Sequence, residues 1–179
     1  MAGPRQMTSQ TLNALKGWPS QSAVDFSTTL DDSALVGRDR VERGTTVHLN
    51  AAGKFALGVG DDPVIPMFLF QANDEPDVSN YGGDPATEKG VWIGISNTGK
   101  MMAFVAAGAY ELCTTCFVPG VYAPNTPLTS PTSGADAGRL TAGTLYTDMI
   151  VGLVSRGVIN NGYGHDALAF WPQTVYPTP

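Results

Sequence analysis

Apolar residues in this chain alternate with polar or small residues over short stretches, and turn-forming residues separate these stretches. Val47–Leu49 and Phe55–Val59 both follow a period of two, and Asn50–Gly53 lies between them. A period of two places successive side chains on opposite faces of a β-strand, and a loop of asparagine and glycine between two such runs is typical of a hairpin. The pattern therefore predicts a β-hairpin over residues 45–59.

Further strand patterns follow. Val64–Phe70 contains Pro66, which cannot donate a hydrogen bond to a ladder, so this run predicts an edge strand or a bulge. Val91–Ile95 alternates, and after a turn it is followed by the apolar run Met101–Ala107, so a second hairpin is expected there. Tyr110–Val118 predicts one more strand.

The last forty residues contain two apolar runs joined by a turn. Met149–Val154 is nearly uncharged, so it can be buried on both faces. Asn160–Gly162 supplies residues that tolerate positive φ, and Ala167–Trp171 is a second strand pattern that ends at Pro172. A C-terminal hairpin or a bulged corner is therefore expected.

Three segments do not follow a strand pattern. Residues 1–24 are polar and turn-rich and predict an extended N-terminal arm, with one possible short helix over Ser9–Lys16, while residues 25–179 form a single β-rich body. Asn73–Pro85 predicts a loop. Pro119–Gly138 is rich in proline, glycine, serine and threonine, so it predicts a long surface loop and a candidate contact surface.

Composition agrees with an all-β fold. The 179 residues include 21 glycines and 13 prolines and are only 15% charged, which favours short segments joined by turns. A net charge of −6 with ten Lys and Arg argues against a nucleic-acid partner. No run approaches the roughly 18 apolar residues that span a membrane, and the first ten residues lack a secretory signal, so we expect synthesis in a cytoplasm.

Cys113 and Cys116 form the one pattern with a possible metal or redox chemistry, a lone CxxC. A structural zinc site needs four ligands, and His48 and His165 are not at ligand spacing to each other or to the cysteines. On a single strand, residues three apart point to opposite faces, so the two thiols would diverge. We therefore expect buried free cysteines, and no metal or cofactor.

Catalytic chemistry is not expected either. His48 is interpreted as lying on the polar face of a strand, and His165 as forming a local hydrogen bond with the adjacent Asp166. The acidic pairs Asp31-Asp32 and Asp61-Asp62 lack the ligand spacing of a calcium loop and are interpreted as solvated turn residues. The sequence therefore predicts a protein that is not an enzyme.

Two features are candidate contacts with a partner. Arg38, Arg40 and Arg43 belong to a run of alternating charge, which favours a solvated segment but could also reach acidic groups of a neighbour. Trp18, followed by a proline, is either an anchor on a neighbouring protein or a side chain folded back onto its own domain.

The order of these runs resembles the head decoration, or cement, proteins of tailed bacteriophages. The stretches that carry the resemblance, within residues 25–172, are AGKFALGVG, YELCTTCFVPGVYAPNTPLT, RLTAGTLYTD and the segment from Asp148 onward. The resemblance implies a β-barrel or β-sandwich body, usually a homotrimer, whose arm or loops grip the major capsid protein. It also implies a location on the outer surface of an icosahedral head.

Two other functions stay open. A tail-associated or carbohydrate-binding β module would share this composition, because Trp18, Trp92, Trp171 and six tyrosines could stack on sugar rings. A small hydrolase would require a nucleophile, a base and an orienting group, which we cannot assemble from two histidines. An apolar content of 42% in a small β-rich body also favours an oligomer, most simply a trimer.

Overall fold

The computed structural model describes residues 12–16, 26–28, 30–31, 41–60, 64–69, 101–161 and 164–178. Within these residues the chain forms β-strands and no helix, so the all-β prediction is confirmed. The strands are β1 (Leu12–Lys16), β2 (Phe26–Thr28), β3 (Thr46–Leu49), β4 (Phe55–Leu57), β5 (Met67–Leu69), β6 (Met101–Val105), β7 (Glu111–Thr114), β8 (Pro127–Thr129), β9 (Thr141–Ala142), β10 (Ile150–Asn160) and β11 (Asp166–Val175).

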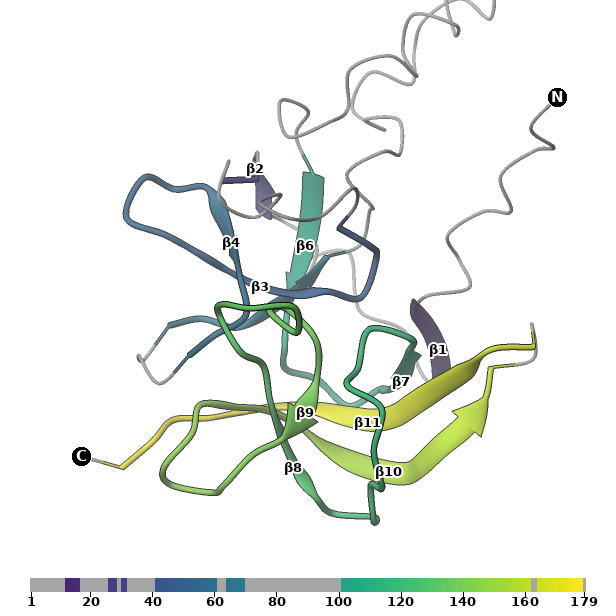
Figure 1. Ribbon diagram of the computed structural model, residues 1–179. Helices are drawn as coiled ribbons and strands as arrows, with labels where there is room; N and C mark the ends of the chain where they lie inside the picture. The colour runs from purple at the N-terminus through teal and green to yellow at the C-terminus, as the bar shows by residue number, and fades with distance from the viewer. Residues whose placement is uncertain are drawn as a thin grey trace, which may run out of the picture.

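The strands form two antiparallel sheets. One has six strands in the order β1-β7-β11-β10-β8-β9, and the other has five in the order β2-β6-β5-β3-β4. Figure 1 shows β3, β4 and β6 above β8, β10 and β11, with the C-terminus at one end of the six-stranded sheet and β1 toward the other. Segments distant in the sequence, such as β1 and β7, therefore become neighbours.

Both hairpins predicted from the described residues are present. In the first, Val47 pairs with Leu57, and Gly53 in the turn has φ of 70°, a conformation that residues with a Cβ rarely adopt. In the second, β10 and β11 pair antiparallel up to Asn160 opposite Asp166. A further hairpin was predicted over residues 91–107, and the structure describes this segment only from Met101, where β6 begins. The predicted loop Asn73–Pro85 lies outside the described residues.

The two proline predictions were wrong. Pro66 precedes β5, which is the central strand of its sheet, and the Pro66 carbonyl accepts a hydrogen bond of 2.8 Å from the Ala106 amide. Pro172 does not end its strand: it lies within β11 opposite Gly152, beside a register shift in the ladder. Prolines are tolerated at strand starts and irregularities because the missing N–H is not needed there.

The predicted helix over Ser9–Lys16 was also wrong. Residues 12–16 form β1, which pairs antiparallel with β7, and the Leu12 side chain is buried in the core. Pairing with a strand about one hundred residues away outweighs the weak helical spacing of two leucines. The remaining residues of the predicted arm, 1–11 and 17–24, lie outside the described residues, so the arm stays a prediction.

The segment Pro119–Gly138 is not one long surface loop. It contains β8, and Leu128 of β8 is fully buried opposite Gly152 of β10. A strand of three residues is too short for its period to be recognised in the sequence. The preceding strand β7 ends at Thr114 rather than at Val118, and Phe117 forms an isolated parallel bridge with Leu140.

The largest hydrophobic cluster joins the two sheets. Phe68 of β5 and Phe170 of β11 are both fully buried, and their rings meet with centroids 5.3 Å apart at an interplanar angle of 55°. Tilted aromatic pairs at this distance add a specific interaction to the burial of apolar area. The two sheets are therefore joined by this cluster, and a separate cluster contains most of the buried apolar residues of the five-stranded sheet.

The segment 130–139 connects the sheets through backbone hydrogen bonds. The Val59 amide donates to the Ser130 carbonyl at 3.0 Å, and the Thr46 amide donates to the Gly138 carbonyl at 2.8 Å. Gly58, with φ of 68°, approaches so closely that a Cβ there would lie 1.9 Å from the Pro131 carbonyl oxygen. This close approach positions the edge of the five-stranded sheet beside the residues that line a pocket.

Candidate functional site

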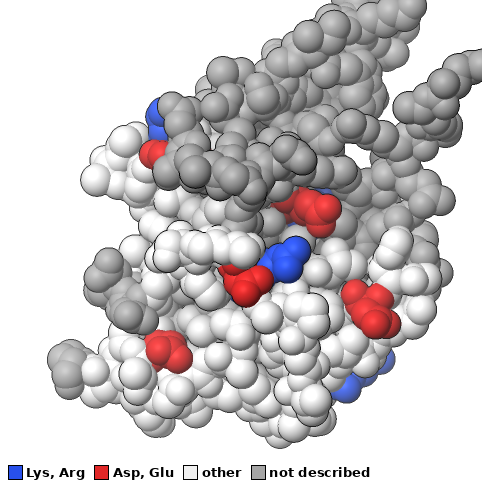
Figure 2. Space-filling model, in the orientation of Figure 1, with Lys and Arg blue, Asp and Glu red and all other residues white. Residues whose placement is uncertain are grey.

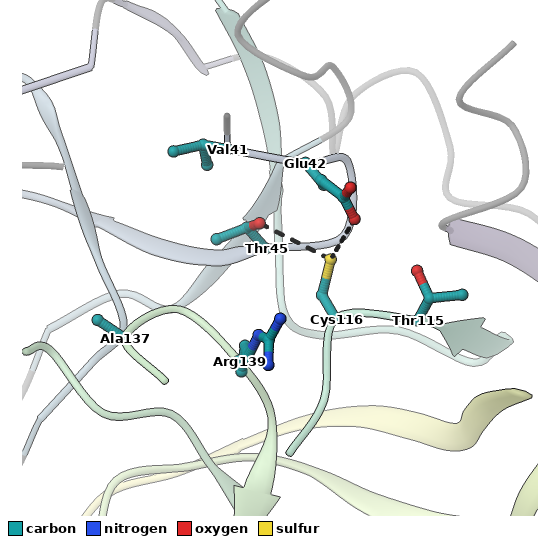
Figure 3. Close-up of a pocket in the computed structure, with 7 residues that line it drawn as sticks. All are labelled: Val41, Glu42, Thr45, Thr115, Cys116, Ala137 and Arg139. Atoms are coloured by element: carbon teal, nitrogen blue, oxygen red, sulfur yellow. Dashed lines mark hydrogen bonds between the residues drawn. The ribbon is translucent and has the colours of Figure 1, made fainter. Parts of the chain in front are cut away.

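A pocket of about 160 Å³ opens where the two sheets meet. Residues from the segment before β3, the segment after β7 and the connecting segment 130–139 form its wall. The lining residues are Val41, Glu42, Thr45, Thr115, Cys116, Ala137 and Arg139 (Figure 3).

The Cys116 thiol is a buried polar group of the pocket. Its sulfur lies 3.3 Å from the Arg43 carbonyl, 3.9 Å from Glu42 Oε2 and 3.8 Å from Thr45 Oγ1, which donates to it (Figure 3). Burial, reinforced by the negative charge of Glu42, raises the pKa of Cys116 to about 11. At neutral pH the group is therefore a protonated thiol, which is a weak nucleophile and a weak metal ligand.

Both cysteines are buried and free, as the sequence predicted. The reason is different, because β7 ends at Thr114 and strand parity does not extend to Cys116. Cys113 instead packs with Ala167 and Ala169 of β11, whereas Cys116 lies in the pocket. The chain therefore places the two thiols in separate environments.

The two histidines lie in different elements, His48 on β3 and His165 in the turn before β11. His48 is half-buried, and its Nδ1 lies 2.7 Å from the Gly58 carbonyl, so Nδ1 carries the proton and donates. His165 is exposed, and its backbone amide donates to Asn161 Oδ1 at 3.3 Å. The hydrogen bond at this turn therefore involves the His165 backbone rather than the predicted pairing of its ring with Asp166.

Acidic residues of the described part do not gather into a metal site. Asp31 accepts a hydrogen bond of 2.7 Å from Asn50 and so ties its segment to the β3–β4 turn. Asp32, Asp61 and Asp62 lie outside the described residues. Within the described ranges, no group of three or more His, Cys, Asp or Glu could hold a metal ion.

Of the four predicted contact residues, the structure describes Arg43 alone. Arg43 is partly buried, and its carbonyl accepts the thiol hydrogen bond of Cys116. Trp18, Arg38 and Arg40 lie outside the described residues, so their proposed role in binding a partner stays a prediction.

An ion pair that the sequence analysis missed connects β7 to β10 across β11, which lies between them in the six-stranded sheet. Arg156 donates to both carboxylate oxygens of Glu111, at 2.9 and 2.6 Å. The Glu111 side chain is 1% exposed and that of Arg156 is 48% exposed. These residues are 45 positions apart, so no local pattern in the sequence indicates the pair. Its bidentate geometry is typical of strong, orienting interactions.

Large apolar side chains are exposed at several turns and strand surfaces. Figure 2 shows that neutral side chains cover most of the described area on the face drawn, with only scattered charges. The exposed apolar residues are Ile65, Val121, Leu145, Tyr146, Val158, Trp171 and Tyr176. The sequence analysis singled out Trp171 and the tyrosines from this set, but not Ile65, Val121, Leu145 and Val158, because the exposure of an apolar side chain depends on how the chain folds around it.

In the part of the chain that the structure describes, no helix is long and apolar enough to cross a membrane. Comparisons with protein-family models, with curated proteins and with solved structures found no match to this chain. A function proposed for the protein must therefore depend on its own residues.

Proposed function

We propose that the protein is a structural virion protein that binds the outer surface of an icosahedral phage head and cements neighbouring capsomers. Its partner is the major capsid protein, and it acts as a homotrimer. The observation that carries this proposal is the exposure of large apolar side chains on a body of two sheets that a hydrophobic cluster joins. Exposed apolar patches mark sites where proteins associate.

The body suits a binding role because its sheets hold the turns in fixed positions. The Phe68 and Phe170 rings meet in the cluster that joins them, and backbone bonds from the 130–139 segment connect the sheets. Rigid β scaffolds commonly present their contacts on loops. We also favour a β-sandwich over a closed barrel, because each sheet ends in separate edge strands, β1 and β9 in one and β2 and β4 in the other.

The pocket gives little support to a catalytic role. A thiol with a pKa of about 11 is protonated at neutral pH, so Cys116 is a poor nucleophile there. Neither His48 nor His165 lines the pocket, so none of its described lining residues is a histidine base. A non-enzymatic protein is the simpler interpretation.

The charge balance and the exposed aromatic residues fit a protein partner. A net charge of −6 disfavours binding to nucleic acid inside a head. Tyrosine and tryptophan are enriched where proteins meet, and Tyr146, Trp171 and Tyr176 are exposed. Because these residues lie on different strands and turns, one set can contact the shell while another contacts copies of the chain.

Binding to heads tests the proposal directly. Heads that lack the protein are incubated with increasing amounts of it and then sedimented. We expect saturable co-sedimentation, and we expect saturated heads to release their contents at a higher temperature than bare heads. If the protein stays in the supernatant at all concentrations, or if bound protein leaves head stability unchanged, the proposed function is wrong.

A second candidate is a tail-associated or carbohydrate-binding β module. The exposure of Trp171, Tyr146 and Tyr176 favours it, because aromatic rings stack on the apolar faces of sugars. Saturable binding to polysaccharide from the host surface, without binding to heads, would support this candidate over the first.

A further inference from the structure

Two opposite charges line the pocket between the sheets, and both can turn to a ligand at small cost. In the described part of the chain no cation pairs with the Glu42 carboxylate, whose contact is the Cys116 thiol at 3.9 Å. The Arg139 guanidinium pairs with Asp136 at 3.6 Å, but both of these side chains are 49% exposed. Ion pairs as exposed as this one contribute little to stability, so the guanidinium can exchange Asp136 for a ligand.

The two charges lie on either side of the same thiol. Figure 3 shows the Glu42 carboxylate on one side of the Cys116 sulfur and the Arg139 guanidinium on the other. Burial raises the pKa of Cys116, Glu42 raises it further and Arg139 lowers it, so both charges act on this group. A molecule bound over the thiol would therefore meet a negative charge at one end and a positive charge at the other.

Backbone hydrogen bonds hold both charged residues in place. The Thr45 amide donates to the Glu42 carbonyl at 3.2 Å and closes a tight turn before β3. The Leu140 amide, next to Arg139, donates to the Cys116 carbonyl at 2.9 Å and joins the two other segments of the pocket wall. A site whose backbone is fixed before binding loses little entropy when the ligand arrives.

The inner surface of the pocket is uncharged, and its volume limits the ligand. Val41, Thr45, Cys116 and Ala137 are 1–6% exposed, so water has little access to this surface and screens charges there less than at an open surface. The volume of about 160 Å³ is roughly five times the ~30 Å³ that one water molecule occupies. The pocket therefore has room for a small molecule but not for a nucleotide or an oligosaccharide.

We propose that this pocket binds a small zwitterion that carries an ammonium and a carboxylate group, the class to which free α-amino acids belong. The Glu42 carboxylate accepts hydrogen bonds from the ammonium group, and the Arg139 guanidinium donates to the carboxylate. The charges of the lining residues cancel, so a ligand with a single charge would leave one of these two groups without a partner. The inference concerns binding alone and does not depend on a role at a phage head.

Amino acids with small side chains test this proposal. Glycine and alanine are the probes, and methylammonium and acetate, at the same ionic strength, each present one of the two charges alone. Amide NMR signals of the native protein, including those of Thr45 and Cys116, report both the dissociation constant and the place of binding. The variants Glu42→Gln and Arg139→Gln each remove one charge from the pocket.

Matched controls remove the same charges elsewhere. Asp166→Asn removes a negative charge at the exposed start of β11, and Lys54→Gln removes a positive charge beside the β3–β4 turn. Neither residue lines the pocket. The unfolding temperature of every variant without ligand shows whether the fold is kept. If Glu42→Gln does not fold, Arg139→Gln decides the test, because its side chain is half-exposed.

We expect glycine and alanine to shift the amide signals around the pocket saturably, with dissociation constants in roughly the millimolar range. Methylammonium and acetate should each bind at least about tenfold more weakly than glycine. Glu42→Gln and Arg139→Gln should each weaken glycine binding by at least about tenfold, as for the loss of a hydrogen bond between charged groups. Asp166→Asn and Lys54→Gln should bind glycine as the unmodified protein does.

Four results would overturn the inference. Glycine and alanine leave the signals around the pocket unchanged at every concentration, so the pocket does not bind this class. Methylammonium or acetate binds as tightly as glycine, so the site recognises one charge alone. Arg139→Gln binds glycine as tightly as the unmodified protein, so the guanidinium is not a contact. The control variants weaken binding as much as the pocket variants, so the overall charge of the protein is responsible.

Discussion

Replacing Gly58 by alanine should destabilise the protein severely, because Gly58 lies where the two sheets are connected. Its φ is 68°, and a Cβ at this position would lie 1.9 Å from the Pro131 carbonyl oxygen and 2.8 Å from that of Ser130. Both neighbours are backbone atoms, so no flexible side chain can move aside. The 130–139 segment would have to shift away from the five-stranded sheet.

The magnitude follows from what the shift would break. Placing alanine in the left-handed region costs about 1–2 kcal/mol. Displacement of the segment would also weaken the bond from Val59 to Ser130 and the bond from Gly138 to Pro131, at about 1 kcal/mol each. We expect a loss of about 3–4 kcal/mol in the free energy of unfolding, which corresponds to a fall of roughly 6–16 °C in Tm for a chain of this size.

Gly53→Ala is the matched control. Gly53 has nearly the same φ, 70°, but no heavy atom lies within 4 Å of a Cβ built there. This variant should therefore lose only the strain of about 1–2 kcal/mol. The difference in the free energy of unfolding between the two variants is measured by urea unfolding, in which equal m-values show that only stability has changed. Equal losses for the two variants would show that the close approach of Gly58 to the 130–139 segment is not as described.

Three further predictions concern the thiol, the ion pair and the first strand. Burial raises the pKa of Cys116 to about 11, so the folded state favours the protonated thiol. This preference contributes fully to the free energy of unfolding below the pKa of the same thiol in the unfolded chain, near 9. The contribution should be lost as the pH rises from about 9 to 11. Cys116→Ser should flatten that part of the curve of unfolding free energy against pH, and metal analysis of the unmodified protein should find no zinc. Arg156→Ala should lower the free energy of unfolding by about 3 kcal/mol, because it leaves the buried Glu111 carboxylate without the guanidinium. Glu111→Gln should lower it by only about 1–2 kcal/mol, because the half-exposed Arg156 side chain can then turn to solvent. The opposite order in thermal unfolding would contradict this interpretation. Deleting residues 1–24 should lower the free energy of unfolding by about 2 kcal/mol, because it removes β1 and the buried Leu12. A chain that begins at Leu12 keeps that strand and should therefore be the more stable of the two truncated chains. Equal stability of the two truncated chains would refute the pairing of β1 with β7.

The sequence by itself determined those elements whose partners are close along the chain. The hairpin of β3 and β4 and the hairpin of β10 and β11 each consist of two strands joined by a short turn with residues that tolerate positive φ. In such hairpins the period of two and the turn chemistry lie within one short window, so local patterns are sufficient. The burial of both cysteines was predicted as well, since a small apolar residue without ligand partners favours the core.

Only the tertiary structure decided the features that join distant parts of the chain. β1 pairs with β7 although its sequence spacing suggested a helix, and β5 is a central strand although it follows a proline. The Glu111–Arg156 ion pair and the pocket around Cys116 each combine segments that the chain order separates. Contacts of this kind depend on which faces and edges meet after the sheets form, and no pattern within a single stretch of sequence carries that information.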